Sequence, residues 1–312
     1  MHRVACVVPV TGSVPPGPPR KPLASMLVMA PEPFSVLLPV YAGDNAPFLM
    51  RAFESITTLQ TRPPDEVVIV RDGPVPPPLA ACLGELVERA EVPVTVLEVP
   101  EHRGLGSALR EGMDKCQYDI VARMDADDVS LPERFARQVP LVESGFDLVG
   151  SALTEMRGDE ADLGDVRRPP LTHARIVRFA RFHSPFNHPT VVMRRSAAER
   201  AGGYEHLRSF EDYWLWVRML AGGALAANVE EPLLLYRVRT GAYERRGGSH
   251  LVRPEIELQV RMRRLGFISR VQFARNIAVR VSWRLFPLFL RRWLYGLVFR
   301  RARDPLPVGD VS

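Results

Sequence analysis

The sequence predicts an α/β fold in which helices flank a mostly parallel, doubly wound sheet. From Phe34 onward, short apolar runs alternate with segments of helical spacing, and the runs end in polar or glycine-containing loops. Alternation of this kind favours parallel strands joined by helices. Ligands of such sheets bind beyond the carboxyl ends of the strands. The polar residues at those ends are therefore the first candidates for a functional site.

The expected elements follow one another without an internal repeat. Apolar runs predict strands over residues 34–40, 66–70, 94–99, 120–124, 148–153 and 190–193. Helical spacing predicts helices over residues 47–60, 79–90, 106–116, 131–145 and 210–221. No linker divides this body. We expect one domain over residues 34–250, a disordered Pro-rich leader over residues 1–33, and a basic helical tail over residues 251–312.

The composition is typical of a globular chain and excludes several other classes of protein. Of the 312 residues, 46% are hydrophobic and 25% are charged, which argues against disorder, coiled coil and collagen-like repeats. No run of about 20 uncharged apolar residues predicts a transmembrane helix. Cys6, Cys82 and Cys116 lie too far apart for a C-x-x-C pair, and their odd number argues against a disulfide framework. A reducing cytoplasm is the expected compartment.

Positive charge is concentrated near the carboxyl end of the chain. Residues 253–303 hold 13 arginines against two glutamates, a net charge of +11, so the remainder of this +5 chain carries −6. A basic segment of this kind favours a polyanionic partner, either an anionic membrane face or a nucleic acid.

Helical spacing in the tail separates arginines from aromatic side chains. At about 100° per residue, one arc of about 120° holds five arginines and the opposite side holds large apolar residues. The arginines are Arg270, Arg280, Arg284, Arg291 and Arg292, and the apolar residues are Trp283, Phe286, Leu290 and Trp293. This pattern predicts an interfacial helix on anionic lipid. A helix that packs its aromatic side on the body is the alternative, and nucleic-acid binding is not expected.

Clustered carboxylates follow the predicted strand at 120–124. Asp125, Asp127 and Asp128 lie within four residues, and such close carboxylates repel one another unless a divalent ion joins them. Mn²⁺ or Mg²⁺ is the expected ion, because both prefer oxygen ligands. A solvated turn that caps the next helix would give the same pattern, and we assign Asp128 to that cap because Pro132 follows it.

Two further strand ends carry residues suited to a nucleotide. Asp72 can accept hydrogen bonds from a base or a ribose, although an Asp-Gly turn is an equal alternative. His102 to Leu109 opens a helix, so its backbone amides and Arg103 can face a diphosphate. Leu109 stands where the third glycine of G-x-G-x-x-G belongs, which leaves a dinucleotide-binding fold unsupported.

Taken together, these motifs resemble glycosyltransferase family 2, which has the GT-A fold. The resemblance covers residues 34–250 and is closest to bacterial exopolysaccharide transferases of the amylovoran-biosynthesis kind. The matching segments are residues 34–41, 72–73, 102–104, 125–128, 187–191, 210–216, 236–239 and 245–248. It implies that residues 34–250 form a GT-A catalytic domain.

The resemblance also implies roles for particular residues. Those implied for the donor are Pro39, Tyr41 and Asp72 at the nucleoside, Arg103 and Gly104 beside ribose and phosphate, and Arg245 and Arg246 as a lid over the diphosphate. Those implied for the metal are Asp125, which also contacts the sugar nucleotide, Asp127, and His250 as a third ligand. Asp212 would be the catalytic base. For Arg245 and Arg246, a solvated basic loop is an equal alternative to the lid.

Three residues near Asp212 are candidates for the acceptor site. Glu211 precedes the base, although both acids would also favour the positive end of a helix dipole. Trp214 could stack on a sugar or belong to the core. His188 could contact the acceptor or be a satisfied structural histidine.

These roles imply an inverting, divalent-metal-dependent glycosyltransferase. It would move a sugar from a nucleotide-diphosphate donor to a glycan or lipid-linked acceptor in cell-envelope or exopolysaccharide biosynthesis, at the cytoplasmic face of the plasma membrane. One base and no covalent nucleophile predict inversion. The alternatives are a catalytically silent sugar-nucleotide-binding assembly subunit and a sugar-1-phosphate nucleotidyltransferase, which would need a Gly-rich loop that residues 41–45 do not supply.

Overall fold

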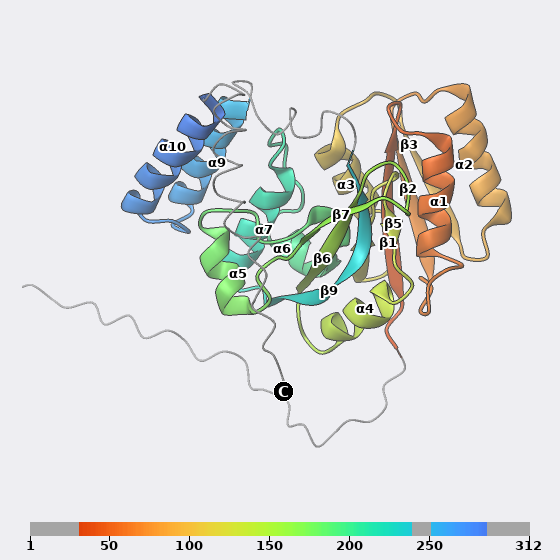
Figure 1. Ribbon diagram of the computed structural model, residues 1–312, viewed down its shortest axis with the longest axis horizontal. Helices are drawn as coiled ribbons and strands as arrows, with labels where there is room; N and C mark the ends of the chain where they lie inside the picture. The colour runs from red at the N-terminus through yellow and green to blue at the C-terminus, as the bar shows by residue number, and fades with distance from the viewer. Residues whose placement is uncertain (1–30, 239–250, 286–312) are drawn as a thin grey trace, which may run out of the picture. The chain divides into compact units, whose positions relative to one another are not determined.

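The computed structural model describes residues 31–238 and 251–285 (Figure 1). Residues 1–30 lie outside this range, so the disordered leader stays a prediction. Arg245, Arg246 and His250 lie outside it too, as does the tail beyond residue 285. Within the described ranges, no helix combines the length and apolar character that crossing a bilayer requires.

A single mixed sheet organises the described part of the chain. Its strands run in the order β3-β2-β1-β4-β8-β6-β9-β5, and β7 pairs with β6. The first half is parallel and consists of β1 (Phe34–Tyr41), β2 (Glu66–Asp72), β3 (Val94–Val99) and β4 (Ile120–Arg123). The second half consists of β5 (Val129–Ser130), β6 (Leu148–Met156), β7 (Leu163–Arg167), β8 (Val192–Arg194) and β9 (Ala226–Arg237). The predicted parallel strands are confirmed, and antiparallel pairing begins where β8 joins β4.

Helices cover both faces of the sheet, as the alternation predicts. Helices α1 (Ala46–Ile56), α2 (Pro77–Arg89) and α4 (Arg134–Glu143) pack on the face that buries Val36 and Leu38. Helices α3 (Leu105–Met113), α5 (His173–Ala180), α6 (Arg195–Arg200) and α7 (Glu211–Ala221) pack on the face that buries Leu37. Because successive strand residues point to opposite faces, both faces of β1 are buried. An uninterrupted apolar run such as residues 36–38 follows from that.

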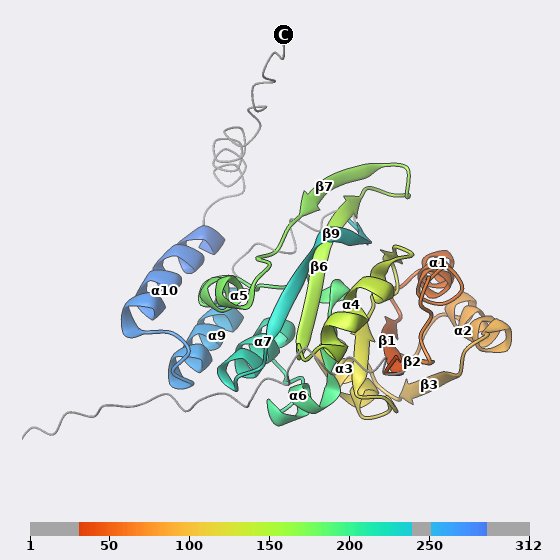
Figure 2. The same ribbon diagram turned by 90° about the horizontal axis from the view of Figure 1, so that it is seen from below.

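The carboxyl-terminal helices pack on the body of the protein. Helix α9 (Val252–Arg264) contributes Leu258 and Met262 to a cluster with α7, and α10 (Arg270–Leu285) lies against α9 (Figure 2). Asn276 of α10 is fully buried and donates hydrogen bonds to the Arg181 carbonyl oxygen, at 2.8 Å, and to the Gln259 side chain. This part of the tail is integral to the fold.

One residue of the predicted lipid-facing arc is turned inward. The Arg280 guanidinium forms an ion pair of 2.7 Å with Glu255, which is fully buried, and donates to the Phe182 carbonyl oxygen. The prediction for Arg280 is therefore wrong. Helical periodicity defines which residues share a face, but it does not define whether that face meets solvent or protein.

Candidate functional site

A pocket of about 370 Å³ opens at the carboxyl ends of the parallel strands. Six residues predicted from the sequence line it, namely Pro39, Tyr41, Asp72, Gly104, Asp125 and Asp127. They come from β1, β2, the start of α3 and the loop after β4. Parallel strands β2, β1 and β4 lie side by side, so their carboxyl ends meet at one edge of the sheet.

At one end of the pocket, the Asp72 carboxylate organises the loop after β3. Its oxygens accept hydrogen bonds from the backbone N–H groups of Arg103, at 2.8 Å, and Gly104, at 2.9 Å. His102 Nδ1 lies 2.8 Å from the same carboxylate, and the His102 ring stacks on Tyr41 with centroids 5.8 Å apart. Asp72 thus fixes the wall of the pocket as well as lining it.

Arg103 takes part through its backbone. Its guanidinium is more than half exposed and lies 3.3 Å from Glu111, and its side chain does not line the pocket. Gly104, next in the chain, has φ of 87° and immediately precedes α3. This left-handed conformation favours glycine, and it occurs where the chain enters α3 at the wall of the pocket.

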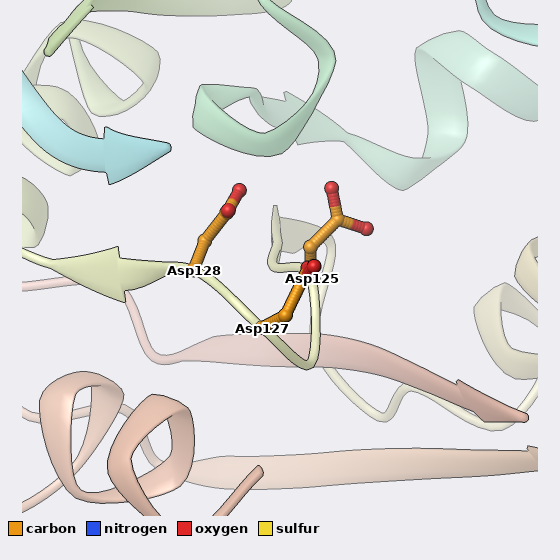
Figure 3. A group of neighbouring side chains, drawn as sticks. All are labelled: Asp125, Asp127 and Asp128. Carbon is orange, nitrogen blue, oxygen red and sulfur yellow. The ribbon is translucent and has the colours of Figure 1, made fainter. Parts of the chain in front are cut away.

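The three aspartates after β4 converge beside the pocket, and two of them, Asp125 and Asp127, line its other end. Asp125, Asp127 and Asp128 each offer a carboxylate oxygen, and these oxygens all lie within 4.8 Å of one another (Figure 3). Asp128 Oδ2 is buried and accepts no hydrogen bond from the described residues. Burial, together with the nearby Asp125 and Asp127 charges, raises the pKa of Asp128 well above its usual range. An all-oxygen donor set with one unsatisfied oxygen fits a hard divalent cation.

Asp128 does not cap the following helix, so that expectation is wrong. Helix α4 begins only at Arg134, with Glu133 before it, and Asp128 Oδ1 instead accepts the Arg237 backbone N–H at 2.9 Å. The return of β9 alongside β5 provides this donor, and sequence spacing carries no sign of that pairing.

Two arginines that sequence analysis did not assign to the site hold the aspartate loop. Arg123 is 2% exposed, and its Nη2 lies 2.5 Å from Asp125 Oδ1. Arg237 lines the pocket, donates from Nε to the Asp127 carbonyl oxygen at 2.8 Å, and lies over the Phe48 ring. A charged residue inside the apolar run at 120–124 was the available signal for Arg123, because a buried arginine needs a partner.

Glu211 and Asp212 open α7 on the same side of the sheet as α3. An added Cβ on Gly106 would lie 3.1 Å from Glu211 Cβ, so the small residue lets the pair approach α3. Ser209, two residues earlier, has φ of 66°, a strained conformation of the kind that clusters at functional sites. Arg123 and Asp125 both act electrostatically on the pair, which places it beside the aspartate loop.

The surroundings favour protonation of this pair. Burial and then the Asp212 charge raise the pKa of Glu211 to about 7, and burial raises the pKa of Asp212. His188 Nδ1 lies 3.9 Å from Asp212 Oδ2, while His188 Nε2 is 3.0 Å from the Tyr204 hydroxyl. Burial, helped by the Arg123 charge, lowers the pKa of His188 well below its usual value, so the imidazole is neutral. A carboxylate with a raised pKa is suited to accept a proton near neutral pH.

Trp214 lies away from the pocket. It is 7% exposed within the cluster shared by α7 and α9, and its indole N–H donates to Glu205 Oε2 at 2.9 Å. Its placement matches the core alternative, so we assign it no acceptor role. His188 and Glu211, by contrast, both lie beside Asp212.

Sequence comparisons identify related glycosyltransferases. A family model described as glycosyl transferase family 2 matches residues 35–202. An uncharacterized glycosyltransferase of Haemophilus influenzae is 37% identical over 86% of this chain and 99% of its own length. The amylovoran biosynthesis glycosyltransferase AmsE of Erwinia amylovora is 34% identical over 84% of this chain and 97% of its own. The Escherichia coli UDP-Gal:alpha-D-GlcNAc-diphosphoundecaprenol beta-1,3-galactosyltransferase is 33% identical over 86% and 97%.

Solved structures share the fold at lower sequence identity. TarS of S. aureus in complex with UDP-GlcNAc has a TM-score of 0.61 and 15% identity, covering 79% of this chain and 70% of TarS. The mannosyltransferase PcManGT of Pyrobaculum calidifontis, in complex with GDP-Man and Mn²⁺, has a TM-score of 0.58 and 18% identity, covering 89% and 78%. These likenesses confirm the expected GT-A fold.

Proposed function

Because the chain belongs to glycosyl transferase family 2 and is a glycosyltransferase, we propose that it transfers a sugar, with inversion and with a divalent cation, from a nucleotide-diphosphate donor. The observation that carries this proposal is the pocket that joins Tyr41 and Asp72 to Asp125 and Asp127. Its two ends differ in chemistry as the two ends of a sugar nucleotide do.

The donor is proposed to lie along the pocket. Its nucleoside would lie between Asp72 and the stacked rings of Tyr41 and His102. Pro39 and Gly104 would complete that end, and the backbone amides at the start of α3 would face the diphosphate. Arg245 and Arg246, which lie outside the described residues, stay proposed as a lid.

Asp125, Asp127 and Asp128 would hold Mn²⁺ or Mg²⁺. Such a cation neutralises negative charge that grows on the departing diphosphate. Asp128 enters this set because its Oδ2 lacks a partner among the described residues, and His250 remains a proposed ligand that the described ranges do not include. Arg123 would hold the aspartate loop through its ion pair with Asp125. Arg237 of β9 would hold it through the hydrogen bond to the Asp127 carbonyl oxygen.

Asp212 is proposed as the general base for the acceptor hydroxyl. Its raised pKa favours proton acceptance, and neutral His188 beside it does not compete as a cation for the carboxylate. A single base that activates the acceptor directly gives one displacement and therefore inversion at the anomeric carbon. Glu211 would share the proton with Asp212 or contact the acceptor.

The acceptor is proposed to be a growing glycan, carried on lipid, in cell-envelope or exopolysaccharide biosynthesis. The names of two relatives support this, since one concerns amylovoran and the other a diphosphoundecaprenol acceptor. Such an acceptor would bring the enzyme to the cytoplasmic membrane face. The tail beyond residue 285 is one proposed point of attachment.

A panel of UDP-, GDP- and dTDP-sugars tests the proposal. We expect one of them to bind and to hydrolyse slowly with Mn²⁺ or Mg²⁺, and not with excess EDTA. Transfer of that sugar to an acceptor should give a product of inverted configuration, read by NMR of the anomeric proton. Retention of configuration would reject the single displacement. Tight donor binding without hydrolysis or transfer would instead indicate a silent binding subunit.

A further inference from the structure

A second groove, of about 640 Å³, lies between α5, α10 and the segment at residues 168–170. Helix α10 lies near α5 in Figure 2, and Asn276 of α10 donates to the carbonyl oxygen of Arg181, the residue after α5. None of the described residues that line the groove is acidic. Five are arginines, namely Arg168, Arg175, Arg178, Arg181 and Arg275. This concentration of positive charge is separate from the donor pocket, with which it shares no lining residue.

Within the described part of the chain, no ion pair balances the charges of the groove arginines. Across residues 31–238 and 251–285, none of the five forms an ion pair with an aspartate or a glutamate. Arg280, which also lies on α10, differs from them because it forms an ion pair with buried Glu255. Arg275 instead donates to Asn276 and lies 4.7 Å from the Phe182 ring centroid. Like charges without counter-charges repel one another, and an external anion would relieve that repulsion.

Exposed apolar side chains lie beside these arginines. Phe179 lines the groove and is 41% exposed. On α10, Val271 is 79% exposed and Val279 is 51% exposed. Val271, Arg275 and Val279 are spaced by four residues, which places them within about 80° on one face of the helix. Arginines interleaved with exposed apolar side chains are typical of surfaces that lie in a lipid headgroup region.

We propose that the groove between α5 and α10 docks the enzyme on the headgroup phosphates of an anionic lipid bilayer. The arginines would contact the phosphates, while Phe179, Val271 and Val279 would enter the acyl boundary. Phe179 could stack on a base, but the exposed Val271 and Val279 offer only apolar surface, which an acyl boundary buries and a nucleic acid does not, so we favour a bilayer. The inference rests on the proposed function in one respect, since a lipid-linked acceptor would lie at that same surface.

The groove and the proposed base are linked through one tyrosine. Tyr213 follows Asp212 at the start of α7, and its hydroxyl donates to the Ala180 carbonyl oxygen, at the end of α5, at 2.8 Å. Arg181, which follows directly, lines the groove. Docking through α5 would therefore hold the helix that carries Asp212 close to the bilayer.

Vesicle binding by the full chain tests this surface. Arg175→Gln with Arg178→Gln removes two exposed charges from α5. Each arginine near an anionic surface contributes about 1 kcal/mol, so the double variant should bind phosphatidylglycerol vesicles about 30-fold more weakly. Binding to phosphatidylcholine vesicles should be weak for both proteins, and added NaCl should reduce the difference between the variants. Co-sedimentation measures each partition coefficient.

Two matched pairs serve as controls. Arg89→Gln with Arg137→Gln removes the same charge from exposed positions on α2 and α4 and should leave vesicle binding within about twofold of wild type. Arg291→Gln with Arg292→Gln removes it from the tail, the other proposed point of attachment, and loss of vesicle binding confined to this pair would assign docking to the tail and overturn the groove proposal. If the groove pair binds as wild type does, or weakens binding no more than the α2 and α4 pair, the groove is not the docking surface. Stronger salt-dependent retention on DNA than on vesicles would also overturn the proposal.

A second readout separates this proposal from the proposed function. Sugar transfer to a water-soluble acceptor is measured on the same preparations. Groove-dependent vesicle binding without any transfer would uphold the docking surface and reject the transferase chemistry. If transfer occurs and vesicle binding does not change when Arg175 and Arg178 are replaced, the transferase chemistry is upheld and the docking surface is rejected. Arg168→Gln with Arg275→Gln repeats the test from the other walls, and a thermal melt verifies that each variant is folded.

Discussion

The two groups of carboxylates at the site differ in their surroundings more than in their residue types. Asp125, Asp127 and Asp128 converge within 4.8 Å, and Arg123 contacts Asp125 directly. Glu211 and Asp212 are adjacent at a helix start, with neutral His188 as the nearest imidazole. We propose that the first group surrounds a cation and that the second accepts a proton from the acceptor hydroxyl. The surroundings of each group thus favour a different proposed role for carboxylates of the same chemical type.

Removing a carboxylate from the first group should have the largest effect. Asp127→Ala takes away one of the converging oxygens, so we expect loss of detectable transfer and loss of Mn²⁺-dependent nucleotide binding. The fold should persist, because Asp127 lies in a pocket-lining loop. Calorimetry of nucleotide binding with and without Mn²⁺ measures the effect, with Asp162→Ala, an exposed acid, as the control. Wild-type activity in excess EDTA would contradict the cation assignment.

The matching change in the second group should spare donor binding. Asp212→Asn keeps the shape of the side chain but accepts no proton, so turnover should fall by roughly 10²–10⁴ while the donor dissociation constant stays within about threefold. Single-turnover kinetics and donor titration together measure this split. Collapse of donor affinity along with turnover would mean that Asp212 is structural and that the two groups are not functionally distinct.

Arg123 acts electrostatically on both groups, so replacing it should change the pKa values of carboxylates in both. Its charge lowers the pKa of Asp128, Glu211 and Asp212. Arg123→Met should therefore raise these pKa values, move the acid limb of the pH–rate profile to higher pH, and reduce transfer at pH 7 by about tenfold. Arg123→Lys should restore most of the profile because it keeps the charge. An unchanged acid limb in the Met variant would show that Arg123 acts on Asp125 alone.

Of these changes, Glu211→Gln should have the smallest effect on transfer. Its main effect should be on stability, because ionising Glu211 in the folded state costs free energy. Its folded-state pKa is raised to about 7 from an ordinary value of 4.5. The folded state therefore binds the proton more tightly, and stability falls as pH rises from about 4.5 to about 7. Glu211→Gln should raise unfolding free energy at pH 8 by up to about 3 kcal/mol and change it little at pH 4.

Denaturant titrations of protein without added metal at both pH values measure this difference. Glu231→Gln, at an exposed position on β9, is the control and should show no pH-dependent gain. Equal stabilisation at pH 4 and pH 8 would mean that packing, and not ionisation, distinguishes the variant.

Local sequence pattern predicted the parallel half of the sheet but not all of the other half. The buried strands β1, β2 and β4 form nearly continuous apolar runs, which mark them clearly. Strand β9 escaped prediction because Glu230, Glu231 and Pro232 interrupt its apolar pattern, at the point where its pairing with β6 shifts register. Strand β5 has only two residues, too few for any pattern. Its pairing with β9 joins residues more than 100 positions apart.

The site was predictable where it depends on strand ends and not where it depends on packing. Asp72, Asp125 and Asp127 follow apolar runs, so the topology alone brings them to one pocket. Asp128 and Trp214 were assigned from spacing within one helix or turn, and partners from distant strands and helices decided their places. Arg123 was missed because nothing in an apolar strand shows which acid an arginine will meet.

The bonds from Asp72 to residues 102–104 have a thermodynamic consequence. Because this carboxylate already holds the loop, a nucleotide that enters the pocket has little backbone to order, so less conformational entropy is lost on binding. The Asp72 oxygens also accept hydrogen bonds from these loop residues, so they are less available to a base or a ribose. Affinity at this end would then depend on shape and stacking, which tolerate a change of base, more than on a single directional contact.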